Sequence, residues 1–297
     1  MINRAPIFVN GFQRGGTNIL VNFITSHPHV CAVGETQKIF YGRHKEALYK
    51  QYIQRVSYLP IFLAARQHIF WPERFYERNK LPTLIKHYTD WVFYRNKLAS
   101  PHNTYEDPHM VITKEELAQT RFLCKNVNGV VFASHVFADM YPDATFIGLI
   151  RNGFALCESF IRRGWTAERF GRMYETVCQR IIKDAAQLDN YHLVRFEDII
   201  TNPVASAQTI YSYLHLDITK VSKFRLQAKK SMTTNGKRKY AFGGNVDREV
   251  HWFPIDQLEQ YIQKDVNKNQ IARLRDTDKK VFLQYAHASM EKLGYLS

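Results

Sequence analysis

Short apolar runs alternate with longer stretches of helical periodicity along most of the chain. The short runs have the β-prone composition of buried strands, and the longer stretches repeat apolar residues every three or four positions. Strands are predicted near 6–11, 30–33, 121–126, 144–150 and 192–196, and helices near 19–24, 131–141, 155–163, 170–188, 205–214 and 277–293. Strands that alternate with helices in this way predict an α/β fold with a central parallel sheet flanked by helices.

A glycine-rich turn separates the first predicted strand from the first helix. Gly15 and Gly16 let the backbone turn where a side chain would clash. Free amide groups and the positive end of the helix dipole meet at such a turn, which suits a phosphate or sulfate, and Arg14 adds a guanidinium. The glycine spacing is that of the Walker A loop, but Thr17 and Asn18 replace its Lys-[Ser/Thr] pair. A purely structural turn is the alternative.

Charged residues also end or follow three later strands. Glu35 follows the second strand, Lys125 lies near the end of the third, and Arg151 ends the fourth, with Ser159 two turns into the next helix. Loops at the carboxyl ends of parallel strands line the ligand crevice, so Glu35 should face the same site as the first turn. A carboxylate there can accept a proton, and an arginine with a following hydroxyl can bind a second phosphate. Taken singly, a surface Glu, a surface Arg and a helix-interior Ser are the ordinary alternatives.

A segment from about 40 to 120 is dense in aromatic and basic residues, with Tyr49, Tyr52, Val56 and Leu59 at helical spacing. Aromatic stripes interleaved with Arg and Lys can stack on the bases of single-stranded nucleic acid. More often they form the inner faces of helices, with basic stems covering the rim. We therefore expect a helical insertion that packs on the domain and shapes an acceptor pocket.

Composition sets the class of protein. The 297 residues are 45% hydrophobic and 23% charged, which predicts one globular domain over 1–297. Lys and Arg number 41 against 27 acidic residues, a formal charge of +14, so anionic partners are expected, although a solvated basic face is the simpler explanation.

Cysteine usage and hydropathy bear on the compartment. Cys31, Cys124, Cys157 and Cys178 show no metal-ligand spacing, so they should be small buried hydrophobes in a reducing compartment. No apolar segment precedes Pro6, and no apolar run reaches the ~18 residues of a membrane span. We expect a soluble, cytoplasmic protein.

These segments together resemble the sulfotransferases that use 3′-phosphoadenosine 5′-phosphosulfate (PAPS). The family's RxGTT-like loop, which holds the 5′-phosphosulfate, is matched by Arg14, Gly15, Gly16, Thr17 and Asn18. Its strand-end arginine with a serine eight positions later, which holds the 3′-phosphate, is matched by Arg151 and Ser159. Residues 196–203 resemble its YEDLxxxP segment, and 293–295 its LGY ending.

The resemblance implies a P-loop-like three-layer fold and roles for individual residues. The layout is most similar to the tyrosylprotein sulfotransferase branch and related bacterial-type enzymes, which implies Glu35 as the base and Lys125 as the group that steadies the sulfuryl group. Arg14 would act where charge develops on the donor. Two departures are Asn18 in place of the second threonine and Phe196 in place of the usual tyrosine near the adenine.

The resemblance also implies the ligands. PAPS would be the donor, adenosine 3′,5′-bisphosphate (PAP) the product, and no metal would be required. Ser231, Lys237 and Arg238 lie in or beside a basic loop that could close over the 3′-phosphate, or could equally be a mobile solvated loop. The acceptor would be a hydroxyl, with a glycan or a small molecule favoured over protein tyrosine.

Three other functions stay open on the sequence. A P-loop kinase or NTPase shares the strand, turn and helix but requires the missing Lys-[Ser/Thr] pair. A basic module without catalysis would bind nucleic acid, a partner that we do not expect, and its binding would fall steeply with salt. An inactive sulfotransferase-like protein would bind nucleotide without transfer.

Overall fold

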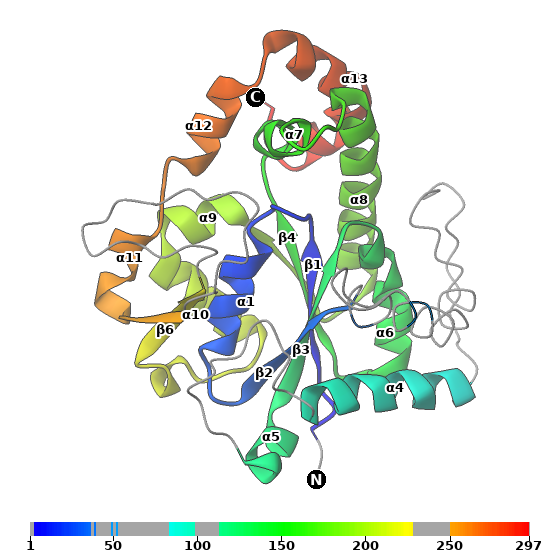
Figure 1. Ribbon diagram of the computed structural model, residues 1–297, viewed down its shortest axis with the longest axis vertical. Coiled ribbons are helices and arrows are strands. Elements are labelled where there is room, and N and C mark those ends of the chain that lie inside the picture. Colours follow the sequence, from blue (N-terminus) through cyan, green and yellow to red (C-terminus); the bar gives the residue numbers. More distant parts are fainter. Residues whose placement is uncertain are drawn as a thin grey trace.

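Five parallel strands form a central sheet in the order β2-β3-β1-β4-β5 (Figure 1). The structure is a computed structural model that describes residues 3–36, 39, 49, 52, 83–98, 113–227 and 250–296. The strands are β1 (Ile7–Gly11), β2 (Val30–Glu35), β3 (Arg121–Val127), β4 (Thr145–Ile150) and β5 (Tyr191–Arg195). Every pairing among them is parallel, which confirms the predicted α/β fold. Their carboxyl ends therefore share one edge of the sheet.

The central strand β1 pairs with β3 on one side and with β4 on the other. Its side chains alternate between two hydrophobic clusters, Phe8 entering one, and Ile7 and Val9 the other. All five residues of β1 are buried. A strand covered on both faces reads as a continuous apolar run, which explains why the pattern around residues 7–11 has no polar alternation.

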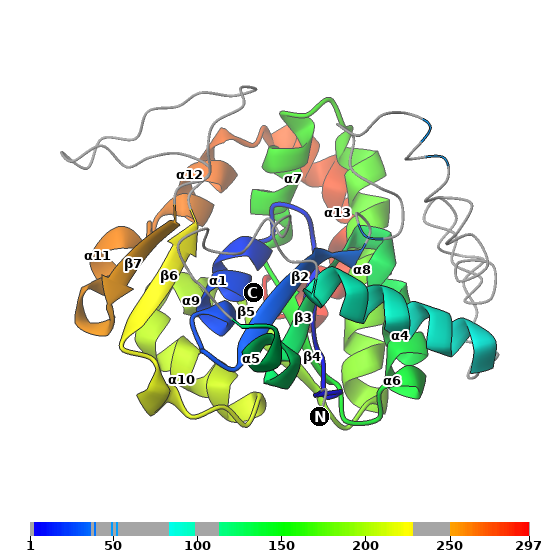
Figure 2. The same ribbon diagram turned by 60° about the horizontal axis from the view of Figure 1, so that its bottom comes forward.

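Helices cover both faces and make a three-layer structure (Figures 1 and 2). One face carries α1 (Thr17–Thr25), α9 (Phe196–Thr201), α10 (Pro203–Tyr213) and a small antiparallel sheet of β6 (Lys223–Gln227) and β7 (Val250–Pro254). The other carries α4 (Thr83–Leu98), the 3₁₀ helix η3 (Asn128–Ala133), α6 (Ser134–Met140), α8 (Ala167–Gln187) and α13 (Asp276–Lys292).

Shorter elements complete the part of the chain that the structure describes. After β4, α7 (Gly153–Ile161) packs on α12 (Val266–Arg273) at one end of the molecule (Figure 1). The remaining elements are α5 (Lys114–Gln119), η4 (Ile218–Lys220), η5 (Ile255–Gln257) and α11 (Leu258–Tyr261).

Most predicted elements agree with the structure to within a few residues, and three features differ. The helix expected over 131–141 is divided into η3 and α6, which spacing cannot distinguish because both helix types bring residues three apart together. Residues 197–198, for which no helix was predicted, form the first turn of α9, where two carboxylates favour a helix N-terminus. The β6–β7 sheet was not predicted. Of the predicted 40–120 insertion, α4 and α5 are helical, and most of the rest lies outside the described residues.

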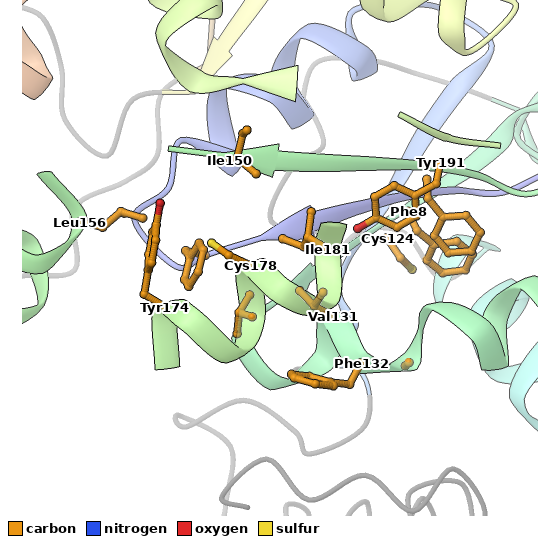
Figure 3. Close-up of a cluster of buried hydrophobic side chains, with 14 of the residues drawn as sticks. Phe8, Cys124, Val131, Phe132, Ile150, Leu156, Tyr174, Cys178, Ile181 and Tyr191 are labelled. Carbon is orange, nitrogen blue, oxygen red and sulfur yellow. The ribbon is translucent and has the colours of Figure 1, made fainter. Parts of the chain in front are cut away.

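The core between α8 and the sheet is built from aromatic, aliphatic and thiol groups (Figure 3). Tyr174, Cys178 and Ile181 of α8 point towards the strands, and Phe8 stacks on Phe146 with ring centroids 5.2 Å apart. All four cysteines are buried thiols, as predicted. Burial raises the pKa of the Cys124 thiol well above its usual value, which keeps it protonated and unreactive.

The turn between β1 and α1 requires glycine at one position. Gly16, the N-cap of α1, has φ of 93°, a left-handed conformation that residues with a Cβ rarely adopt. A Cβ at Gly16 would also lie 2.1 Å from Cδ2 of Phe196, so the aromatic ring rests directly on this backbone. Gly164 has a similar φ of 82°, but a Cβ there would meet nothing within 4 Å.

A lysine is buried near the amino ends of the strands. Lys97 of α4 is fully buried, and its ammonium donates to the main-chain oxygens of Ala118 and Thr120 at the end of α5. A cation at a helix C-terminus is favourable, but burial lowers the pKa of Lys97 to about 8.

We predict that Gly16→Ala destabilises the protein by roughly 2–4 kcal/mol, from about 1 kcal/mol of backbone strain plus the overlap with Phe196. Gly164→Ala is the matched control, because it introduces the same strain without the overlap and should cost about 1 kcal/mol. Urea unfolding of both variants measures the difference. Equal losses would show that the ring does not rest on the turn.

Lys97→Met tests the buried lysine. Because the pKa of Lys97 in the folded protein, about 8, lies below that of an exposed lysine, the unfolded chain binds more protons between the two values. The penalty for burying the charge is therefore full at lower pH and disappears as pH rises. Relative to Lys97→Met, the wild-type free energy of unfolding should increase by about 1–2 kcal/mol between about pH 7.5 and 9.5. A difference between the two proteins that does not change with pH would contradict this.

Candidate active site

The turn after β1 presents a helix N-terminus at the carboxyl edge of the sheet. Arg14 and Gly16 both have positive φ, which directs the chain sharply into α1. In the described part of the chain, no side chain caps this N-terminus, and the first turn of α1 holds no acidic residue. The first amides of a helix have no partner within the helix. The turn therefore offers amide donors and the positive end of a dipole to an anion.

Lys125 joins two of the predicted site residues. The register of β2 and β3 places Glu35 opposite Lys125. The Lys125 ammonium lies 2.6 Å from Oε1 of Glu35 and donates to Oδ1 of Asn18 at 2.7 Å. Only 5% of the Lys125 side chain and 14% of the Glu35 side chain are exposed. A carboxylate, an ammonium and the start of α1 thus meet at one point.

A buried chain of hydrogen bonds lies beneath this point. The Asn126 amide donates to Oδ1 of Asn10 at 2.9 Å, and the Thr36 hydroxyl donates to Oδ1 of Asn126. The Asn10 amide donates in turn to the hydroxyls of Ser134 at 2.9 Å and Tyr191 at 3.0 Å. Satisfied polar groups of this kind fix the relative positions of the strands that carry them.

The same chain of hydrogen bonds positions the residues above it. Thr36 follows Glu35 and Asn126 follows Lys125 in the sequence. The hydrogen bond between Thr36 and Asn126 therefore helps to fix the backbone that carries both charged side chains. Sequence reasoning did not identify Asn10 or Thr36 as part of the site. The sequence did contain a signal for Asn10. It is a polar residue inside an apolar strand, and such residues are tolerated only with hydrogen-bond partners.

Arg151 lies at the end of β4 and reaches the turn after β1. Its Nη1 donates to the main-chain oxygen of Arg14 at 2.6 Å, and its Nε donates to Oδ1 of Asn267 at 2.8 Å. Its Nη2 donates to Oε1 of Gln270. The guanidinium carbon is 4.2 Å from the centroid of the Phe196 ring. The structure therefore brings the two predicted anion-binding segments into direct contact.

The charge of Arg151 has no bonded carboxylate among the described residues, since all three of its acceptors are neutral oxygens. Only 4% of the residue is exposed. Burial lowers the pKa of Arg151 to about 10, against the smaller, opposite influence of Glu197. Buried charges in proteins are usually paired, so this guanidinium is suited to an anionic ligand.

Arg14 lies in a positive environment of its own. Burial lowers the pKa of Arg14, and the charges of Arg163 and Arg162 lower it further. Arg162 forms an ion pair with Glu158 at 2.8 Å, and Arg163 is exposed. The end of α7 therefore adds cations beside the turn, which strengthens its attraction for anions.

Other predicted site residues are less directly placed. Phe196 is buried, with the Arg151 guanidinium over its ring and Gly16 against its edge, so it supports these groups by packing. Ser159 is buried on α7 and makes no hydrogen bond to Arg151 within the ranges that the structure describes. The predicted ligands of the basic loop, Ser231, Lys237 and Arg238, lie outside the described residues.

Glu197 connects the segment at 196–203 with residues near the end of the chain. Its Oε1 accepts from the Asn152 backbone N–H at 3.0 Å and from the Asn267 amide at 2.5 Å. Its Oε2 accepts from the hydroxyl of Tyr295 at 2.8 Å. The sequence pattern gave no role to Glu197 or Tyr295, because their contact depends on how the last helices pack.

The described residues contain neither a metal-binding cluster nor a membrane-spanning helix. Among the described residues, no group of three or more His, Cys, Asp or Glu side chains could hold a metal ion. None of the helices in the described part of the chain is long and apolar enough to cross a membrane.

Several solved structures are similar to the chain. They include the sulfotransferase domain from the Synechococcus PCC 7002 olefin synthase, with 14% identity, 96% of each chain covered and a TM-score of 0.47. The sulfotransferase domain from the curacin biosynthetic pathway has 12% identity, covers 96% of this chain and 98% of its own, and has a TM-score of 0.49. Mouse sulfotransferase SULT7A1 complexed with PAP has 10% identity, 97% and 85% coverage, and a TM-score of 0.46.

Sequence comparisons give the family. No curated protein matches the chain. The model of the sulfotransferase family matches residues 6–220, which is more than half of the chain and includes the turn after β1, the paired ends of β2 and β3, and Arg151. The chain belongs to the sulfotransferase family.

Proposed function

We propose that the protein transfers a sulfuryl group from PAPS to the hydroxyl of an acceptor, with Glu35 as the general base. The observation that carries this proposal is the convergence of Glu35, Lys125 and Asn18 at the carboxyl edge of the sheet, where β1 opens into α1. Membership of the sulfotransferase family supports the reaction class. This membership favours sulfuryl transfer over the kinase and nucleic-acid-binding alternatives.

The 5′-phosphosulfate of the donor would lie on the turn after β1. Gly15, Gly16, Thr17 and Asn18 would surround it with backbone amides, and Arg14 would add a positive charge. Transfer builds negative charge on the oxygen that bridges sulfur and the 5′-phosphate. Donors that are already in place stabilise such charge at little reorganisation cost, which is the main way that active sites of this kind lower a barrier.

Glu35 would take the proton of the acceptor hydroxyl as its oxygen attacks sulfur in line. A new S–O bond to the acceptor forms while the S–O bond to the 5′-phosphate breaks, and PAP leaves with the electron pair. Lys125, which lies 2.6 Å from Glu35, would steady the sulfuryl oxygens next to the base. The contact would keep the proton acceptor and the cation on the same side of the donor.

The 3′-phosphate would bind Arg151, whose buried charge is held by neutral acceptors in the described residues. The contact between Arg151 and the main chain of Arg14 supports one nucleotide that spans both groups. Ser159 and Phe196, and Ser231, Lys237 and Arg238 of the basic loop, stay predicted ligands of this nucleotide.

The acceptor is proposed at the level of its chemistry. We favour a glycan or a small molecule with a hydroxyl, because the segment that follows β2 in the sequence is rich in aromatic and basic residues, which can stack on such acceptors and bind their polar groups. Four buried thiols suit the cytoplasmic location that we propose. We also propose that the chain forms one domain.

Thermal melting with PAP or ATP tests the donor. At about 100 times its dissociation constant, a ligand that binds only the folded protein adds about 2.7 kcal/mol, which raises Tm by roughly 5 °C for a chain of this size. We expect that shift with PAP and a much smaller one with ATP, since the Walker lysine is absent. Equal shifts with both nucleotides, or none with PAP, would contradict the proposed donor.

Glu35→Gln tests the base. The amide keeps the shape of the side chain but cannot take a proton, so we expect kcat for PAP release in the presence of hydroxyl acceptors to fall about 10²- to 10⁴-fold. PAP affinity should be retained, because Glu35 does not bind the nucleotide. The exposed Glu168→Gln is the matched control and should leave both quantities unchanged. Wild-type turnover in Glu35→Gln would exclude this carboxylate as the base.

A further inference from the structure

We propose that Asn267 and Gln270 of α12 are positioning residues that leave the charge of Arg151 available to the nucleotide. Their neutral oxygens accept from the guanidinium, and their NH₂ groups bind the carboxylates of Glu197 and Glu158, which therefore do not bond to Arg151 directly. This inference rests on the proposed function and adds a determinant that lies beyond the residues matched by the family model. Figure 1 shows α12 at the same end of the molecule as α7, which follows Arg151.

The two amides make the same pair of contacts. Asn267 accepts from Nε of Arg151 at 2.8 Å and donates to Oε1 of Glu197 at 2.5 Å. Gln270 accepts from Nη2 of Arg151 and donates to Oε2 of Glu158 at 3.3 Å. Each amide therefore separates the guanidinium from a carboxylate that would otherwise be its natural partner.

The chemistry of the neighbours fixes the orientation of both amides. A guanidinium can only donate hydrogen bonds, and an ionised carboxylate can only accept them. An amide between the two must turn its oxygen to the arginine and its NH₂ group to the carboxylate. Reversing Asn267 or Gln270 would place donor against donor and acceptor against acceptor, so the arrangement has one satisfied form.

The carboxylates behind the amides already have other partners. Oε1 of Glu158 lies 2.8 Å from Nε of Arg162 and 2.9 Å from Nε of Arg273. Glu197 accepts from the backbone of Asn152 and from Tyr295. Both carboxylates are therefore bonded to other groups, and their influence on Arg151 acts through space without a direct bond.

Arg151 keeps donors for a ligand. A guanidinium has five N–H groups, and protein oxygens of Arg14, Asn267 and Gln270 accept from three of them. Two N–H groups are thus left without a protein acceptor among the described residues, in a plane that the other three bonds hold fixed. A phosphate accepts two parallel bonds from such a plane, and a fixed plane loses little entropy on binding.

Replacing the Gln270 amide with a carboxylate should remove this availability. In Gln270→Glu, the new charge would pair with Arg151 and repel the nucleotide phosphate. We expect PAP affinity, measured by calorimetry, to fall about 10- to 100-fold. KM for PAPS should rise in parallel, while kcat at saturating PAPS stays near the wild-type value because the reacting atoms lie at the other end of the nucleotide.

Three further variants separate charge from packing. Asn269→Asp makes the same chemical change at an exposed position of α12 and should leave PAP affinity unchanged. Gln270→Met removes both hydrogen bonds without adding charge and should weaken PAP less than Gln270→Glu. In an Arg151→Ala background, Gln270→Glu should weaken PAP binding less than it does in the wild-type protein, because only its direct repulsion of the phosphate remains.

The outcomes distinguish this inference from the proposed function. If wild-type protein binds PAP but Gln270→Glu binds it equally well, or no more weakly than Gln270→Met, the positioning role is excluded while the donor stands. If wild-type protein does not bind PAP, the donor is excluded, and inorganic phosphate becomes the probe. Thermal stabilisation by phosphate that is lost in Gln270→Glu and kept in Asn269→Asp would still support the inference. Equal stabilisation of the wild-type protein and both variants would overturn it.

Discussion

The hydrogen bond from the Arg151 guanidinium to the main-chain oxygen of Arg14 is the contact on which the rest of the site depends. It joins the turn after β4 to the turn after β1, and it can form because the two strands are parallel neighbours whose carboxyl ends share one edge. The glycine-rich turn and the ring of Phe196 pack beside this bond. Two groups suited to anions are thereby held at a fixed separation.

The site handles its buried charges in two different ways. Lys125 has a carboxylate, Glu35, at ion-pair distance, whereas Arg151 is bonded to neutral oxygens with carboxylates one residue further away. In the proposed reaction the two arrangements have different roles. The first arrangement keeps a base and a cation together where a proton and a sulfuryl group must move, and the second keeps a charge ready for a phosphate that does not react.

Sequence reasoning succeeded where the information was local. Strand-end positions placed Glu35, Lys125 and Arg151 at one edge, because parallel strands fix which ends meet. It did not find Asn267, Gln270 or the contact of Glu197 with Tyr295, because these join segments about 100 residues apart through the packing of α12 and α13. No local pattern marks an amide on a polar helix as the partner of a distant arginine. Asn10 is the intermediate case, since a polar residue in a buried strand signals a partner without naming it.

A crystal structure of the protein with PAP tests most directly whether both anion-binding groups hold one nucleotide. We predict the 5′-phosphate on the amides that follow Gly15, and the 3′-phosphate within hydrogen-bond distance of the Arg151 guanidinium. PAP bound with its 3′-phosphate away from Arg151, or with neither phosphate at the turn after β1, would contradict this prediction.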